Sequence, residues 1–203
     1  MYVNCEKIKR QDAVWVLETR ILWINSISLS LHLQSLTYFQ AHLDMADMDK
    51  DHDRLIRVAI DVARQARNKG NHPFGAILAD EHGNILLEAQ NTVVTENDVT
   101  GHAETNLMRL ASNKYNDHFL ANCTLYTSTE PCAMCSGAIF WGNVRQVVFG
   151  LRSESLYEMV NQNSENVLSL SCREVFAKGR KPIEVIGPVL EEEAKEVHQG
   201  FWT

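Results

Sequence analysis

Two short motifs that lie far apart along the chain constrain its fold more than any other feature. The first is His102-Ala103-Glu104, and the second is Pro131-Cys132-Ala133-Met134-Cys135. One imidazole and two thiolates form a ligand set for zinc, and a site with three protein ligands keeps its fourth position open, as catalytic zinc sites do. The chain is therefore expected to fold so that the two motifs meet around one Zn²⁺ ion.

Both motifs are expected at the starts of helices. The pattern predicts one helix over 102–112 and another over 132–141, the second directly after Pro131 ends a strand. The partial positive charge of a helix N-terminus favours a thiolate, and the i, i+3 spacing puts the sulfurs of Cys132 and Cys135 on one face. Zinc lowers the pKa of a bound water from ~15.7 to roughly 7. Glu104 is predicted to be the catalytic residue that moves the protons of this water.

Other interpretations of the cysteine pair account for fewer residues. A CxxC motif by itself also occurs in redox pairs and in structural zinc sites. A redox pair leaves His102 and Glu104 without a role. A structural site needs a fourth ligand, for which Cys123 and Cys172 are candidates. Because small buried cysteines are common, these two are predicted to be structural.

In their residues, order and spacing, the two motifs are similar to those of the zinc deaminases. From about Leu55 to Phe149 the chain resembles the cytidine/deoxycytidylate deaminase superfamily, in its branch that acts on nucleobases and on tRNA adenosine. The resemblance implies a three-layer α/β/α fold with a central mixed five-stranded sheet, and a zinc cofactor. It also implies a hydrolase that releases ammonia from a cyclic amidine, and a homodimer.

The order of elements along the chain agrees with this fold class. Apolar residues at helical spacing predict a helix over 53–69, followed by strands and helices in alternation after one hairpin turn at 81–84. The predicted strands cover 74–79, 85–90, 124–129, 144–149 and 183–186, and a closing helix covers 190–201. Periodicity is weak over 153–181, where no element is predicted. Strands that alternate with helices indicate a sheet covered on both faces.

The resemblance further implies a set of substrate-binding residues. They are Asn91 at a base edge, Phe74 and Trp141 beside a purine, Ala103, and Trp202. An amide suits a base edge because it carries a donor and an acceptor together. Plainer interpretations stay open: a turn residue for Asn91, a core aromatic for Phe74 and packing of a helix end for Trp141. The C-terminal aromatics form either a lid over the site or an anchor for the last helix.

Three substrate classes fit these motifs. The leading interpretation is a free nucleobase or nucleoside, with purines such as guanine, guanosine or adenine first, because Phe74 and Trp141 suit a purine-sized slot. A tRNA-specific adenosine-to-inosine deaminase and a cytosine deaminase are the alternatives. Against guanine, the segment 156–161 lacks the aspartate of guanine deaminases, and Glu158 is the candidate substitute. An inactive zinc-stabilised scaffold is disfavoured because Glu104 is present.

Charge and cysteine content bear on partners and location. The net charge is −7 and no block of Lys or Arg stands out, whereas proteins that bind nucleic acid usually present a basic face. The tail carries glutamates at 191, 192, 193 and 196 against Lys195. A small-molecule partner is therefore favoured over nucleic acid, with tRNA left open. Five cysteines fit no disulfide framework, and thiolate ligands need a reducing compartment, so a cytoplasmic location is expected.

Residues 1–43 are interpreted as an extension that precedes a deaminase domain over 44–203. Ile21–Phe39 has nearly the length of a membrane span, but its four serines and other polar residues make it a poor one, and no membrane partner is expected. The segment before it contains acidic residues and no clear cleavage site follows, which is unlike a signal peptide. Translation from Met45 or Met48, a loosely docked extension and a targeting segment stay open, and N-terminal mass spectrometry would separate them.

Overall fold

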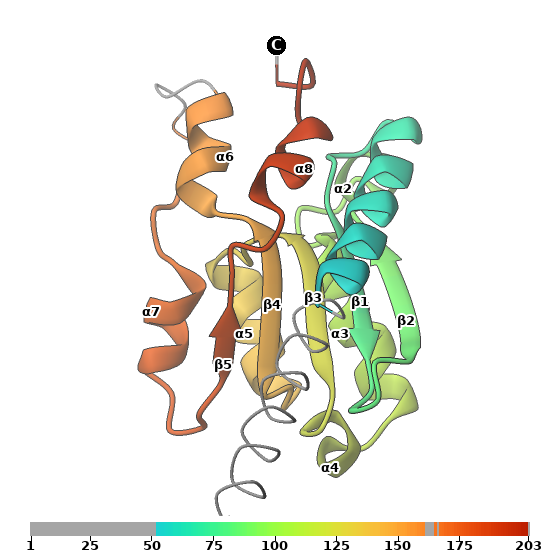
Figure 1. Ribbon diagram of the computed structural model, residues 1–203, viewed down its shortest axis with the longest axis vertical. Helices are drawn as coiled ribbons and strands as arrows, with labels where there is room; N and C mark the ends of the chain where they lie inside the picture. The colour runs from blue at the N-terminus through green and yellow to red at the C-terminus, as the bar shows by residue number, and fades with distance from the viewer. Residues whose placement is uncertain (1–51, 161–164, 166, 203) are drawn as a thin grey trace, which may run out of the picture. The chain divides into compact units, whose positions relative to one another are not determined.

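A mixed five-stranded sheet lies between two layers of helices in the computed structural model (Figure 1). The strand order is β2-β1-β3-β4-β5, with β1 antiparallel to both of its neighbours and β3, β4 and β5 parallel to one another. The strands are β1 Gly75–Ala79, β2 Ile85–Gln90, β3 Thr124–Thr129, β4 Gln146–Leu151 and β5 Glu184–Ile186. The predicted three-layer α/β/α fold is confirmed.

The structure describes residues 52–160, 165 and 167–202, which belong to the unit Lys50–Thr203. The predicted extension over 1–43 and its boundary with the domain lie outside the described residues. Within the described part of the chain, none of the helices has both the length and the hydropathy that crossing a membrane requires.

Alternate side chains of β1 pack into two hydrophobic cores, one on each face of the sheet. Ala76 and Leu78 pack on the layer that contains α3 (Ala103–Lys114) and α5 (Ala133–Trp141). Ile77 and Ala79 pack on the layer of the helix over 52–68 and α8 (Glu191–Glu196). All five residues of β1 are buried. A strand that is apolar on both sides is what a central position in a covered sheet requires.

Gly75 is the position where the helix over 52–68 comes closest to the sheet. A Cβ atom built on Gly75 would lie 2.4 Å from the backbone nitrogen of Ala63 and 2.5 Å from the carbonyl oxygen of Ala59. Both of these atoms are backbone and cannot move aside at low cost. Glycine therefore lets this helix pack directly on the start of β1, next to the loop that contains Phe74.

Four short helices were not predicted from the sequence. They are α2 Val93–Glu96, α4 Asp117–Leu120, α6 Ser153–Met159 and α7 Cys172–Ala177. Each is too short to show a helical period, so only a capping signal could reveal it. The N-cap of α7 has such a signal, a capping box formed by Ser171 and Glu174. The closing helix also differs from its prediction, because α8 ends at Glu196 and the chain continues in turns to Phe201.

Candidate active site

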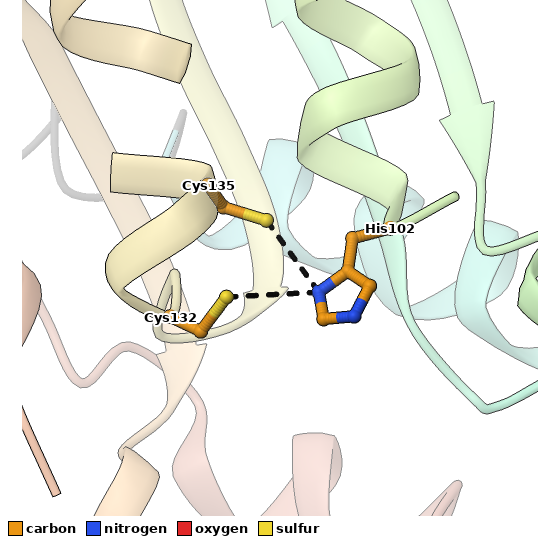
Figure 2. Close-up of side chains that lie close together, drawn as sticks. All are labelled: His102, Cys132 and Cys135. Atoms are coloured by element: carbon orange, nitrogen blue, oxygen red, sulfur yellow. Dashed lines mark hydrogen bonds between the residues drawn. The ribbon is translucent and has the colours of Figure 1, made fainter. Parts of the chain in front are cut away.

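The two motifs meet as predicted, at the starts of α3 and α5. His102 is the N-cap residue of α3, Cys132 is the N-cap residue of α5, and Cys135 lies in the first turn of α5. The Nδ1 atom of His102 is 3.6 Å from the Sγ atom of Cys132 and 3.6 Å from that of Cys135. Figure 2 shows both thiols directed at the same ring nitrogen.

This arrangement fits a metal ion with three protein ligands. The ligand atoms of His102, Cys132 and Cys135 all lie within 4.8 Å of one another. Cys123 and Cys172 are buried and are not part of this group of described residues. The alternative of a closed structural site with one of them as fourth ligand is therefore not supported. One nitrogen and two sulfur donors that leave a position open correspond to a catalytic zinc site.

The charges of the three ligands depend on one another. A hydrogen bond from the Cys135 thiol, together with one from His102, lowers the pKa of Cys132 to about 4. The pKa of Cys135 is raised, because its thiol donates that hydrogen bond and is buried. The hydrogen bond to Cys132 raises the pKa of His102. The arrangement therefore favours the thiolate form of Cys132, which is the form that binds a cation.

Glu104 lies beside the ligands in a buried position. Its side chain is only 5% exposed. The Thr127 hydroxyl donates to Oε1 at 2.9 Å, and the Cys135 thiol lies 3.4 Å from Oε2. Burial raises the pKa of this carboxyl, and the negative charge of Cys132 adds to the effect. A carboxylate that is easier to protonate than usual and held in one orientation is suited to accept a proton and return it.

Asn91 is fully buried directly after β2, and one of its two side-chain polar atoms has no hydrogen-bond partner in the described part of the chain. Its Oδ1 accepts a hydrogen bond from the backbone N–H of Val93 at 3.1 Å. Its Nδ2 has no hydrogen-bond partner among the described residues. The amide oxygen thus already accepts one hydrogen bond within the protein, whereas the amide nitrogen has none. Asn91 can therefore offer a ligand a free N–H donor, which an acceptor on the ligand would match.

Phe74 and Trp202, predicted as substrate contacts, come together in an aromatic cluster. Their ring centroids are 6.0 Å apart. We call the set of rings around them the C-terminal aromatic cluster, and its members are His72, Phe74, His198, Phe201 and Trp202. Phe74 is tied to the site by its backbone, because its carbonyl oxygen accepts a hydrogen bond from the N–H of Asn91 at 3.0 Å.

The two remaining predicted contacts have different surroundings. Ala103 is fully buried between the metal ligand His102 and Glu104, and its methyl group packs into the core beneath α3. Trp141 is 78% exposed in the last turn of α5, whereas the metal ligands of α5 lie at its first turn. In the described part of the chain, no contact brings Trp141 to the metal centre.

Three residues that support the site were missed in the sequence. Thr127 orients Glu104, as described above. Glu130 is 7% exposed and accepts hydrogen bonds from the backbone N–H groups of Ser153 and Cys172, both at 3.2 Å. It thereby fixes the starts of α6 and α7 next to the second motif. His198 is buried and 3.3 Å from the Thr129 hydroxyl. No local pattern could have shown these pairings, since their partners lie 23 to 69 residues away in the chain.

Comparison with known proteins agrees with this geometry. The family model of the cytidine and deoxycytidylate deaminase zinc-binding region matches residues 49–151. A probable cytosine deaminase of Schizosaccharomyces pombe is 47% identical over 148 residues, which cover 72% of this chain and 90% of that protein. A tRNA-specific adenosine deaminase of Haemophilus influenzae is 36% identical over 109 residues, 53% of this chain and 63% of that protein.

A solved structure extends the comparison. A guanine deaminase from Nitrosomonas europaea superposes with a TM-score of 0.63 at 25% identity, covering 73% of this chain and 83% of that one. Because the matching family region is a zinc-binding one, zinc is the metal that His102, Cys132 and Cys135 could hold.

Proposed function

This chain belongs to the cytidine and deoxycytidylate deaminase family. We propose that it removes the amino group of a free nucleobase or nucleoside by hydrolysis of the carbon–nitrogen bond and releases ammonia. The observation that carries the proposal is the buried carboxylate of Glu104 beside three converging metal ligands. A structural or redox role for the cysteines would leave this carboxylate without a purpose.

In the proposed reaction, water adds to the ring carbon that bears the amino group, and that carbon–nitrogen bond then breaks. Zinc held by His102, Cys132 and Cys135 would act as a Lewis acid that allows water to lose a proton near neutral pH. Glu104 takes this proton and delivers it to a ring nitrogen. It then carries a second proton to the departing amine, so that one amidine and one water give one carbonyl and one ammonia.

The residues around Glu104 prepare it for this proton transfer. The hydrogen bond from Thr127 fixes one carboxylate oxygen, and burial keeps the pKa of Glu104 above its usual value. Asn91 positions the substrate by donating from Nδ2 to an acceptor on the base edge. A donor with no protein partner in a buried position favours a ligand that satisfies it, because an unpaired buried polar group is costly.

Purines and cytosine are the two candidate bases. The sequence puts purines first because of Phe74 and Trp141, but the exposed position of Trp141 weakens that support. Glu158, the candidate substitute for the aspartate of guanine deaminases, is exposed on α6. Cytosine is favoured by the Schizosaccharomyces pombe relative, named as a probable cytosine deaminase, which this chain covers over 90% of its length. Both bases carry acceptors that Asn91 could bind.

A tRNA adenosine substrate is the second candidate function, and a cationic cleft favours it. This cleft, of about 510 Å³, is lined by Arg173, Arg180 and Lys181 together with apolar residues between α7 and β5. Two glutamates of the acidic tail are paired with arginines, Glu191 with Arg152 and Glu193 with Arg57. The repulsion between the tail and a phosphate is therefore weaker than four unpaired glutamates would give. Arg173 and Lys181 nonetheless donate hydrogen bonds to backbone carbonyls, which leaves fewer N–H donors for phosphate.

A homodimer and a cytoplasmic location complete the proposal. Trp141 and Met134, which is 38% exposed, place apolar surface on the outer face of α5, where a second copy would cover it. Light scattering on Trp141→Lys would show loss of the dimer if α5 forms the interface. A reducing compartment would keep Cys132 and Cys135 as thiolates.

Ammonia release by the zinc-loaded protein tests the proposed activity. The panel comprises guanine, guanosine, adenine, adenosine, cytosine, cytidine and tRNA, with Glu104→Ala as the blank. Turnover of one small compound is expected. Turnover of tRNA alone would replace the proposal with the editing reaction, and a Glu104→Ala protein as active as the parent would refute the role of this carboxylate.

A further inference from the structure

The neighbours of His72 in the chain hold it at the candidate site, while its own imidazole makes no hydrogen bond with the described residues. The residue before it, Asn71, is 2% exposed, and its Oδ1 accepts hydrogen bonds from the N–H groups of Val94 at 3.1 Å and Thr95 at 3.0 Å. Two residues after it, the Phe74 carbonyl accepts the N–H of Asn91. Both attachments are to the segment that begins at Asn91 and leads to the metal ligand His102.

The ring of His72 faces the C-terminal aromatic cluster. It contacts Trp202 with centroids 5.5 Å apart, Phe201 edge-on at 6.1 Å and Phe74 edge-on at 6.5 Å. These rings come from the loop before β1 and from the end of the chain. Ring contacts of this kind restrict a side chain to few orientations, so His72 has a fixed backbone and a confined ring.

Neither ring nitrogen of His72 has a hydrogen-bond partner among the described residues. His198, by contrast, uses both nitrogens, one with Thr129 and one with Trp202. His72 is half-buried, so part of the residue is accessible to a ligand. Burial lowers the pKa of His72, and the neighbouring His102 adds to this effect, which favours the neutral ring. A neutral imidazole offers one donor and one acceptor.

We propose that His72 is a specificity-determining residue, which hydrogen-bonds a polar group on the edge of the bound base while Asn91 binds another. This inference rests on the proposed function, since it assigns a role in the same site. A heteroaromatic base presents several polar groups around one plane, and two fixed hydrogen-bonding side chains can read two of them. Loss of one such partner in a confined site discriminates strongly between related bases.

Three variants separate hydrogen bonding from packing. His72→Phe keeps an aromatic ring against Phe201 and Trp202 but removes both nitrogens, and His72→Gln restores a donor and an acceptor. His52→Phe is the matched control, because His52 is also half-buried and makes a hydrogen bond with the Tyr126 hydroxyl at 3.0 Å, in the core on the face of the sheet away from α3 and α5. Zinc content and melting temperature are measured for each variant.

For His72→Phe, kcat/KM for the preferred base is expected to fall about 10- to 100-fold relative to the other bases of the panel, mainly through KM. His72→Gln is expected to recover most of this loss, and His52→Phe to leave the ratio unchanged. An equal loss for all bases, or no loss, would overturn the inference, because a merely structural role does not change a ratio between substrates.

Calorimetric binding of the same bases to Glu104→Ala, with and without His72→Phe, separates this inference from the proposed function. If no base is turned over by the parent but one is bound, and His72→Phe weakens that binding at least tenfold, the proposed function fails while the role of His72 stands. If His72→Phe does not weaken the binding, the role of His72 is refuted whether or not the parent is active. If no base of the panel is turned over or bound, both are refuted.

Discussion

At the candidate metal centre, all three ligands lie at the starts of two helices, whereas the C-terminal aromatic cluster joins the loop at 72–74 with the chain end at 198–202. The first region depends on short motifs and on the general property that helix N-termini favour anions. The second depends on contacts between segments that share no local pattern. Local motifs thus indicate the type of reaction, whereas we expect the choice of substrate to depend on distant residues that act together.

The largest expected effect comes from removing a metal ligand. Cys132→Ala is expected to lose zinc and all turnover, and also the stability that bound metal contributes, about 4 kcal/mol when free zinc exceeds its Kd a thousandfold. Metal analysis and thermal unfolding measure both effects. Cys123→Ala is the matched control, since Cys123 is buried outside the metal centre, and it should keep its zinc. Zinc retained by Cys132→Ala would remove Cys132 from the ligand set.

Removing Glu104 should separate chemistry from metal binding within the same region. Glu104→Ala is expected to keep zinc and to lower kcat by about 10³-fold, because positioned acid–base groups contribute roughly 10²- to 10⁴-fold. Glu130→Gln is the matched control, as this second buried glutamate binds backbone N–H groups of α6 and α7. It should lower the melting temperature while most of kcat remains. Comparable losses of kcat in the two variants would contradict the assignment.

The C-terminal region should affect substrate binding more than chemistry. Trp202→Ala, or deletion of residues 201–203, is expected to raise KM about tenfold with zinc retained, because Trp202 covers Phe74 and His72. Steady-state kinetics on the preferred base measure this. Phe119→Ala is a control, an exposed aromatic on α4 that stacks on Tyr115. An unchanged KM for the Trp202 variants would make the tail an anchor for the last helix and not part of the site.

The accuracy of the sequence predictions followed the same division. The bounds of β2 and β3 were predicted to the residue, because each is a run of apolar and β-branched residues between clear turn signals. The convergence of His102 with the cysteine pair was predicted from their chemistry as zinc ligands and from the resemblance of the two motifs to those of the zinc deaminases. In contrast, α6 and α7 were missed, since weak periodicity hid them and their starts are fixed by Glu130 from the loop after β3.

The substrate contacts show why the rest could not be predicted. Asn91 was identified, but only the structure shows that its oxygen accepts a hydrogen bond from Val93 while its nitrogen has no partner among the described residues. Trp141 is an aromatic residue of the kind that lines nucleobase pockets. It is nevertheless exposed at the end of α5, because its position depends on how that helix packs on the sheet. No sequence pattern marks His72 or His198 as part of the site, because their ring contacts form only when the chain end packs against the loop before β1.

The titration of His198 is expected to change stability and to have the smallest effect on turnover. Its side chain is 1% exposed, donates to or accepts from Thr129, and accepts the indole N–H of Trp202 at 3.3 Å. Burial, with a contribution from the charge of Arg67, lowers the pKa of His198 to about 4. In the unfolded chain the pKa of this residue is about 6.5. Between pH 4 and about 6.5, His198 is therefore protonated in the unfolded chain but not in the folded chain.

The sign of the pH effect follows from this difference. Stability contributed by neutral His198 is fully present above pH ~6.5 and is lost as the pH falls toward 4, by at most roughly 3 kcal/mol. Protonation of the zinc ligands also destabilises the protein in acid, so the parent is compared with His198→Gln, which has the same metal centre. Urea unfolding of both proteins at pH 7, 6 and 5 should give a steeper decline for the parent. If the two curves stay parallel over this range, His198 is already exposed to protons in the folded protein, and the cluster is looser than its ring contacts indicate.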